Sequence, residues 1–407
     1  MSDGQYDVVI VGGGMVGAAL ACALGDSALK VAVVEGREPD LGWPREDYDI
    51  RVSAITRASQ HLFENLGVWE GMCQRRVSAY TDMHVWDATG RGEIHFDSAD
   101  IGEPDLGHII ENSVIQSVLL TRLAELENID LLCPLSIESM EFDGRAYTLV
   151  AGDGRQLQAR LLVGADGARS RVREQAGIAA KGWSYEQSAV VCTVTTAQSH
   201  RNTAWQRFMP SGPLAFLPLT ENRSSIVWST TPQQAEALLA LDETAFCRAL
   251  GEAFEFRLGE VTSTGPRGAF PLGLSHAEHY VQNGLALVGD AAHTIHPLAG
   301  QGVNLGLADA AALAEVLLEA HAARKDIGSL AVLRRYERWR RSENLAMMAT
   351  MDGFKRLFSN NSAPLRWLRN LGLGLTNSLG PVKNSLMRQA MGLGMTQSRM
   401  TRRRRHG

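Results

Sequence analysis

Short apolar runs alternate with stretches of small residues at the start of the chain, which is the pattern of buried parallel strands joined by helices. Residues 7–11 form a β-branched run, residues 18–24 an Ala-rich helical stretch, and residues 30–34 a second apolar run. Residues 161–164 and 285–288 repeat the strand pattern far later in the chain. These segments predict an α/β fold in which distant parts of the sequence contribute strands to one core.

The pattern changes between residues 189 and 229, where apolar and polar positions alternate as in half-buried strands. Residues 190–194, 214–219 and 225–228 are examples. We therefore predict a mostly antiparallel sheet that covers a substrate. Aromatic residues are concentrated in and around it, and we expect most to be core and one or two to line a pocket. They are Trp86, Phe96, Trp205, Phe208, Phe216 and Trp228.

Composition indicates a cytoplasmic protein. The 407 residues are enough for two domains, and 45% of them are hydrophobic. The amino terminus is polar and lacks a secretory signal, and no apolar stretch has the length of a transmembrane helix. The five cysteines are scattered without a Cys-x-x-Cys pair, which indicates reduced and mostly buried thiols. No group of residues has the spacing of a metal site.

Charge is unevenly distributed. Residues from 353 onward contain 11 Lys and Arg but no Asp or Glu, so residues 1–352 carry a net charge of −16 although the whole chain carries −5. Such a basic segment is typical of contact with an anionic membrane surface or an acidic partner. The alternatives are a solvated basic end and helices that pack on the protein.

A glycine-rich motif follows the first predicted strand. Gly12, Gly14 and Gly17 stand in the Gly-x-Gly-x-x-Gly spacing between a strand and a helix, and Glu35 ends the next strand. Gly12 permits the tight turn, Gly14 lets a pyrophosphate approach the backbone, and Gly17 lets the helix pack on the strand. Glu35 can accept hydrogen bonds from a ribose. The unit predicts a dinucleotide site but does not distinguish NAD from FAD.

Two further acidic residues follow predicted strands. Asp290 comes after residues 285–288 and precedes a glycine-rich turn that opens a helix through Leu305. Asp166 follows residues 161–164, although a plain Asp-Gly turn also explains it. Because ligands bind at the carboxyl ends of parallel strands, we expect these ends to converge. Dinucleotide motifs at both ends of one chain predict a single FAD, held at its adenine half and at its reactive half.

Three other positions are ambiguous. Arg51 could pair with a phosphate or with a surface carboxylate. Asn112 or Ser113 could cap the helix that begins there, which is as reasonable as cofactor contact. His296 is a candidate base, but a capping or packing role explains it better; His293 lies three residues earlier and also lacks further metal ligands.

Together these motifs resemble the single-component FAD-dependent aromatic hydroxylases of the p-hydroxybenzoate hydroxylase type, and most closely the ubiquinone-biosynthesis hydroxylases. The resemblance rests on Gly12–Gly17, on residues 51–55, 66–69, 111–115 and 164–167, and on residues 285–306, and it continues to residues 386–393. It covers almost the whole chain. The most similar group hydroxylates polyprenylphenol, and the group that acts on a later methoxy-methyl-benzoquinol is close behind.

The resemblance implies a Rossmann-like FAD-binding domain, an antiparallel substrate domain and a basic, helical tail. We expect the FAD domain to comprise residues 1–78, 108–175 and 270–345, the substrate domain residues 79–107 and 176–269, and the tail residues 346–407. The residues that the resemblance assigns to FAD are Gly12, Gly14, Gly17, Glu35, Arg51, Asn112, Asp166, Asp290, Pro297, Gly300, Gln301, Gly302, Val303 and Asn304.

The implied chemistry is that of the cofactor. NAD(P)H reduces FAD as a transient donor, oxygen adds at flavin C4a as a hydroperoxide, and the phenol ring attacks it. A homo-oligomer, a membrane surface or other ubiquinone-biosynthesis proteins are compatible partners, and nucleic acid is not. Three rival functions remain: a halogenase, whose usual Trp-x-Trp-x-Ile-Pro stretch is absent; a prenyl reductase on the same fold; and a non-catalytic FAD-bound subunit.

Overall fold

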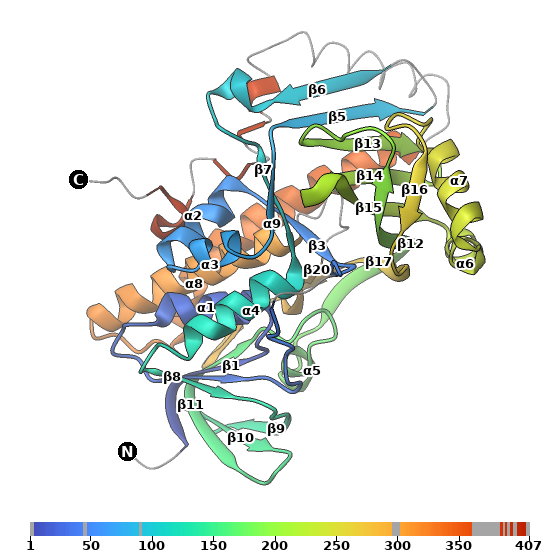
Figure 1. Ribbon diagram of the computed structural model, residues 1–407. Helices are drawn as coiled ribbons and strands as arrows, with labels where there is room; N and C mark the ends of the chain where they lie inside the picture. The colour runs from blue at the N-terminus through green and yellow to red at the C-terminus, as the bar shows by residue number, and fades with distance from the viewer. Residues whose placement is uncertain are drawn as a thin grey trace.

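The computed structural model describes residues 4–43, 47–88, 92–294, 302–359, 383–385, 387–388, 391–393 and 397–403. Three sheets organise them (Figure 1). The first has eight strands in the order β18-β19-β11-β1-β2-β8, with β10 and β9 continuing from β11. Its strands are β1 (Gln5–Val11), β2 (Val31–Val34), β8 (Ile129–Leu132), β9 (Ile137–Phe142), β10 (Tyr147–Ala151), β11 (Gln156–Gly164), β18 (Val281–Gln282) and β19 (Leu285–Leu287).

The central strands of this sheet are parallel. β11 pairs in parallel with both β1 and β19, so that Gly164 lies opposite Val11 on one side and Leu287 on the other. β2 continues the parallel arrangement between β1 and β8. The α/β prediction is confirmed: apolar runs at the two ends of the chain are neighbours in one sheet, and their carboxyl ends share one edge.

Helices with small residues cover this sheet. α1 (Met15–Leu24) packs against α8 (Gly302–Ala322) and α4 (Asn112–Leu123). The contact between α1 and α8 is tight, because a Cβ on Gly306 would lie 2.6 Å from a methyl group of Val16. The long helix α9 (Leu330–Ser359) packs on α8 (Figure 1). α2 (Arg57–Asn65) packs on α8 and α3 (Trp69–Cys73) on α4, whereas α5 (Arg171–Gln175) packs against β11.

The second sheet has nine strands in the order β20-β17-β12-β15-β14-β13-β5-β6, with β16 beside β12. All its pairs are antiparallel except β13 with β5, so the prediction of a mostly antiparallel sheet is confirmed. Its strands are β5 (Asp82–Asp87), β6 (Glu93–Asp97), β12 (Ala180–Thr196), β13 (Thr203–Met209), β14 (Gly212–Pro218), β15 (Arg223–Thr230), β16 (Val261–Thr264), β17 (Gly268–Ala277) and β20 (His293–Thr294).

Two helices, α6 (Pro232–Ala240) and α7 (Glu243–Ala253), lie beside this sheet (Figure 1). Trp86, Phe216 and Trp228 are buried in the apolar cluster beneath them, and Phe216 stacks on Phe254 with ring centres 3.9 Å apart. These aromatic residues are core, as expected for most of the set. A third, three-stranded sheet contains β3 (Val52–Ile55), β7 (Gly107–Glu111) and β4 (Val77–Tyr80).

The described parts of the basic C-terminal segment pack on the protein. Lys383 pairs with Asp100 at 2.7 Å, and Met387 and Met391 are buried against the end of the 3-10 helix η1 (Ser98–Ile101). Further on, the Ser398 hydroxyl donates to Glu315 of α8 at 2.6 Å. Packing, one of the two roles expected for this segment, is therefore present. No described helix combines the length and the apolar character needed to cross a membrane.

Candidate cofactor site

Four chemically distinctive strand ends meet at one edge of the eight-stranded sheet. Gly12 follows β1, Glu35 follows β2, Asp166 lies beyond β11 and Asp290 lies beyond β19. Because these strands are neighbours in the order β19-β11-β1-β2 and run parallel, the expected convergence is confirmed. A hollow of about 430 Å³ at this edge is lined by Gly12, Gly14, Glu35 and Asp166 among other residues.

The surroundings of the three glycines in the amino-terminal motif differ. Gly12 has a φ of +111°, and a Cβ there would lie 2.4 Å from the carbonyl oxygen of Ala165. A Cβ on Gly17 would lie 1.9 Å from the carbonyl oxygen of Gly12. Gly14 differs, because no protein atom lies within 4 Å of its Cβ position. Packing thus requires Gly12 and Gly17, whereas the space at Gly14 is left open in front of α1.

This open space suits a phosphate. The first N–H groups of a helix have no partner within the helix, and the helix dipole makes that end positive. Gly14 is the N-cap of α1 and supplies no side-chain hydrogen bond to it. Anions bind well at such helix ends. The turn is held in place by Gln116, whose side-chain amide donates to the carbonyl oxygen of Gly13 at 3.0 Å.

Glu35 is fixed with its carboxylate at the hollow. One oxygen accepts from the Gly13 N–H at 2.8 Å and the other from the Arg37 N–H at 3.0 Å. Each carboxylate oxygen has a second lone pair, so both can accept a further hydrogen bond. Glu35 is half-buried and lines the hollow. It can therefore hold ribose hydroxyl groups without giving up its structural contacts.

The Asp166 carboxylate stabilises the turn in which it lies. Its two carboxylate oxygens accept from the Ser170 hydroxyl at 2.5 Å and from the Val172 N–H at 3.1 Å, which fixes the start of α5. Arg173 of that helix donates to the carbonyl oxygens of Ala168 at 3.1 Å and Ala291 at 2.9 Å. The guanidinium therefore links the Asp166 turn to the 3-10 helix η3 (Gly289–Ala291), which carries the other acidic residue.

Asp290 has exposed surface, yet the protein around it raises the pKa of its carboxyl group through burial. Both observations fit a side chain at the floor of a recess. His293 and Arg51 act in the opposite direction and lower that pKa. Arg51 itself is exposed, and its guanidinium lies over the Phe270 ring, 5.5 Å from the ring centre. No carboxylate of the described residues forms an ion pair with Arg51, which leaves it available to a phosphate.

The expected capping of α4 by Asn112 or Ser113 is wrong. Glu111 occupies the N-cap position, and the Ser113 N–H is bonded at 3.2 Å by the carboxylate of Asp49, which lies 64 residues earlier. The Asn112 side chain instead accepts from the Ser53 hydroxyl at 2.7 Å, and its backbone N–H donates to the carbonyl oxygen of Arg51 at 3.0 Å. Asn112 therefore lies next to Arg51, which is what a shared contact of both residues with the cofactor requires.

Among the residues predicted in the second motif, Gly302, Val303 and Asn304 begin α8. The Asn304 amide is used within the protein, where it donates to the carbonyl oxygen of Ala54 at 2.7 Å and accepts from the Thr56 N–H at 3.0 Å. It thereby holds the start of α8 against β3. His296, Pro297, Gly300 and Gln301 lie outside the described residues.

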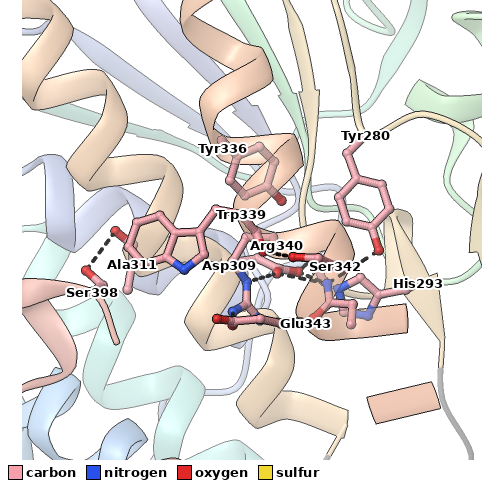
Figure 2. Close-up of polar contacts among 12 residues, drawn as sticks. Tyr280, His293, Asp309, Ala311, Tyr336, Trp339, Arg340, Ser342, Glu343 and Ser398 are labelled. Atoms are coloured by element: carbon pink, nitrogen blue, oxygen red, sulfur yellow. Dashed lines mark hydrogen bonds and ion pairs between the residues drawn. The ribbon is translucent and has the colours of Figure 1, made fainter. Parts of the chain in front are cut away.

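A buried polar cluster beside η3 was not anticipated. Asp309 of α8 contacts His293 and Arg340, and all three are almost fully buried (Figure 2). The available signal was Asp309 itself, which interrupts an Ala- and Leu-rich stretch of α8, since an acid among apolar residues is buried only with partners. Nothing in the local pattern identified those partners.

Comparison with known proteins places these features in context. The FAD binding domain family matches residues 5–350. Ubiquinone hydroxylase UbiL of Rhodospirillum rubrum is 42% identical over 391 residues, covering 96% of this chain and 90% of that protein. The 3-demethoxyubiquinol 3-hydroxylase of Escherichia coli is 40% identical over 393 residues, covering 97% of this chain and 100% of that protein.

Two solved structures share the fold. The p-nitrophenol 4-monooxygenase PnpA of Pseudomonas putida superposes with a TM-score of 0.77 at 20% identity, covering 95% of this chain and 98% of that one. PqsL of Pseudomonas aeruginosa, a probable FAD-dependent monooxygenase, gives a TM-score of 0.74 at 24% identity, covering 91% and 99%. At these identities the likeness shows the architecture alone.

Proposed function

The chain belongs to the FAD-dependent hydroxylases of ubiquinone biosynthesis, and from this premise we propose that it hydroxylates the aromatic ring of a polyprenylated ubiquinone precursor. The observation that carries the proposal is the identity of about 40% to two such hydroxylases over nearly the whole of both chains. The enzyme is accordingly an FAD-dependent monooxygenase, which sets aside the non-catalytic rival.

The residues at the sheet edge fit the two halves of FAD. In this proposal Gly12, Gly14 and the start of α1 bind the pyrophosphate, and Glu35 binds the adenosine ribose. The open Cβ position at Gly14 supports this, because a side chain would fill space that the protein does not use. Asp290 would hold hydroxyl groups of the ribityl chain. Arg51 would contact the pyrophosphate with Asn112 beside it.

When bound, FAD supplies the transfer of two electrons from NAD(P)H to oxygen and the insertion of one oxygen atom into the ring. The overall balance is one NAD(P)H, one proton, one O₂ and one phenol giving NAD(P)⁺, the hydroxylated phenol and water. The protein contributes position and electrostatics. The amino terminus of α8, a helix of 21 residues, begins at Gly302 and favours negative charge near it.

The antiparallel sheet is proposed to cover the substrate ring. Most of its strands fall within residues 79–107 and 176–269, whereas β17 continues to Ala277 and β20 lies beyond both ranges. Covering the ring would exclude water, so that oxygen is used for hydroxylation and not released as peroxide. For the substrate we favour polyprenylphenol. Demethoxyubiquinol is the second candidate, supported by the Escherichia coli relative, which is a 3-demethoxyubiquinol 3-hydroxylase.

The two candidates predict different intermediates in cells that lack this protein. Loss of a polyprenylphenol hydroxylase leaves the unhydroxylated prenylphenol, whereas loss of the later enzyme leaves demethoxyubiquinone. Mass spectrometry of the quinone extract separates them. Accumulation of the prenylphenol supports the first choice, accumulation of demethoxyubiquinone replaces it with the second, and an unchanged quinone profile argues against both. A prenyl reductase is distinguished by reacting without consumption of oxygen.

A further inference from the structure

Four polar groups surround one buried carboxylate next to the proposed flavin site. Asp309 is 0% exposed, and its neighbours His293, Arg340 and Asn344 are at most 4% exposed. Figure 2 shows Asp309, His293 and Arg340 close together, with α9 supplying the arginine. Burying an ionised carboxylate is costly unless it is fully hydrogen-bonded. The ionised form of Asp309 therefore needs a hydrogen-bond donor for each of its lone pairs.

Asp309 receives one hydrogen bond for each of its four lone pairs. One oxygen accepts from the Gly289 N–H at 3.1 Å and from His293 Nε2 at 2.5 Å. The other accepts from Arg340 Nε at 2.8 Å and from the Asn344 amide at 3.2 Å. Because a carboxylate only accepts, His293 must carry a proton on Nε2. The charges of His293 and Arg340 outweigh the effect of burial and lower the pKa of Asp309 to about 2.

The donors on α9 are themselves ordered by further contacts. Arg340 donates to the side-chain oxygen Oδ1 of Asn344 at 3.0 Å and pairs with Glu343. The Asn344 amide also reaches the Tyr280 hydroxyl at 3.4 Å, which in turn contacts His276 Nε2 at 3.1 Å. That hydroxyl accepts from Asn344 and still has its own proton to donate to His276. The cluster is thus a connected hydrogen-bonded network.

The network ends on the backbone that carries Asp290. Gly289 has a φ of +59°, in the left-handed region that favours glycine, and its N–H is the one bonded to Asp309. Tyr336, one helical turn before Arg340, donates to the carbonyl oxygen of Leu287 at 2.7 Å. By contrast, the Asp290 carboxylate has no hydrogen-bond partner in the part of the chain that the structure describes. Its position is therefore determined by the turn, and the turn is held from α9.

We propose that Arg340 and Asn344 are positioning residues for the flavin site, which act through Asp309 on the Gly289–Asp290 turn and thereby set the affinity for FAD. Neither side chain needs to touch the cofactor. Their spacing of four residues, which continues the interval from Tyr336 to Arg340, places the three polar side chains on one face of α9. The inference depends on the FAD site and not on which substrate is hydroxylated.

The test separates cofactor positioning from general stability. Arg340→Met removes the donor and the charge, and Asn344→Leu removes one donor while leaving the Arg340–Asp309 pair in place. The control is Leu333→Ala, which removes a fully buried side chain from the same helix without touching the network. For each variant, the apoprotein melting temperature is measured, and FAD is titrated into folded apoprotein by fluorescence quenching at 25 °C.

We expect the FAD dissociation constant to rise at least tenfold in Arg340→Met and severalfold in Asn344→Leu, with partial recovery in Arg340→Lys. Leu333→Ala should lower the melting temperature but leave the dissociation constant within about twofold of wild type. If the network variants lose melting temperature like Leu333→Ala and bind FAD normally, the cluster only stabilises the fold. Should Arg340→Met not fold, Asn344→Leu decides. A wild-type protein without FAD affinity would instead overturn the proposed function.

Discussion

Replacing Gly14 by valine separates cofactor binding from folding. No protein atom lies within 4 Å of the Cβ position of Gly14, and its backbone φ of −68° suits any residue. The valine side chain therefore meets no protein atom at its Cβ and projects into the space assigned to the pyrophosphate. Gly17→Ala is the opposite case, because its Cβ would lie 1.9 Å from the carbonyl oxygen of Gly12 and would disrupt the strand–helix contact itself.

The expected loss of FAD affinity can be calculated from the hydrogen bonds that the phosphate loses. Hydrogen bonds to a charged group contribute about 1.5–3 kcal/mol each, so displacing the phosphate from two backbone N–H groups costs about 3–6 kcal/mol. This corresponds to a rise of roughly 100- to 10,000-fold in the dissociation constant of FAD. Folding is affected much less. Valine is a poorer N-cap than glycine by about 1 kcal/mol, which lowers the melting temperature by about 2 °C.

The assay compares three apoproteins prepared free of flavin. Melting temperatures come from circular dichroism, and FAD dissociation constants come from fluorescence titration. Gly14→Val should melt close to wild type and bind FAD weakly or not at all, whereas Gly17→Ala should melt several degrees lower. Normal FAD affinity in a folded Gly14→Val protein would instead show that the motif is only a packing turn.

Three further predictions concern other parts of the molecule. Asp290→Ala should purify with little FAD, seen as loss of the 450 nm flavin band, and full occupancy would remove Asp290 from the site. Burial lowers the pKa of both His108 and His276 to about 4, so above that pH both are neutral in the folded protein and gain protons on unfolding below pH 6.5. The free energy of unfolding should therefore fall between pH 6.5 and 4, by at most about 3 kcal/mol for each histidine. His276→Gln should flatten the pH dependence of the melting temperature, and an unchanged dependence would contradict this. Ending the chain after Pro364 should lower the melting temperature, because the buried Met387 and Met391 are lost, while FAD still binds. If the truncated and the full-length protein co-sediment equally with anionic vesicles, packing is the only role of the segment.

The parts of the site that could be predicted from sequence are those in which neighbouring residues contain the whole signal. A strand, a glycine turn and a helix specify the surroundings of Gly12 to Gly17 within a few residues. Glu35, Asp166 and Asp290 could be placed at strand ends because each lies within two residues of the end of a predicted strand. Their convergence followed from the rule that parallel strands end at the same edge.

The remaining features depend on partners that are distant in sequence. The N–H of Ser113 is bonded by Asp49, 64 residues away, so a search for a local cap selected the wrong residues. The Asn304 side-chain amide donates to the carbonyl oxygen of Ala54, 250 residues away, although the motif suggested a cofactor contact. Asp309 depends on Arg340 in the next helix. Hydrogen bonds between elements are set by tertiary packing, and periodicity within an element does not reveal them.

We propose that this chain inserts an oxygen atom into the ring of a prenylated phenol. The most direct test incubates the purified FAD-loaded enzyme with NADPH, a short-chain prenylphenol and ¹⁸O₂, followed by mass spectrometry of the product. We predict a single new hydroxyl group that carries ¹⁸O, with one NADPH oxidised for each hydroxyl formed. A product that carries no ¹⁸O, or NADPH oxidation that yields only hydrogen peroxide when either the prenylphenol or the demethoxyubiquinol candidate is supplied, would contradict it.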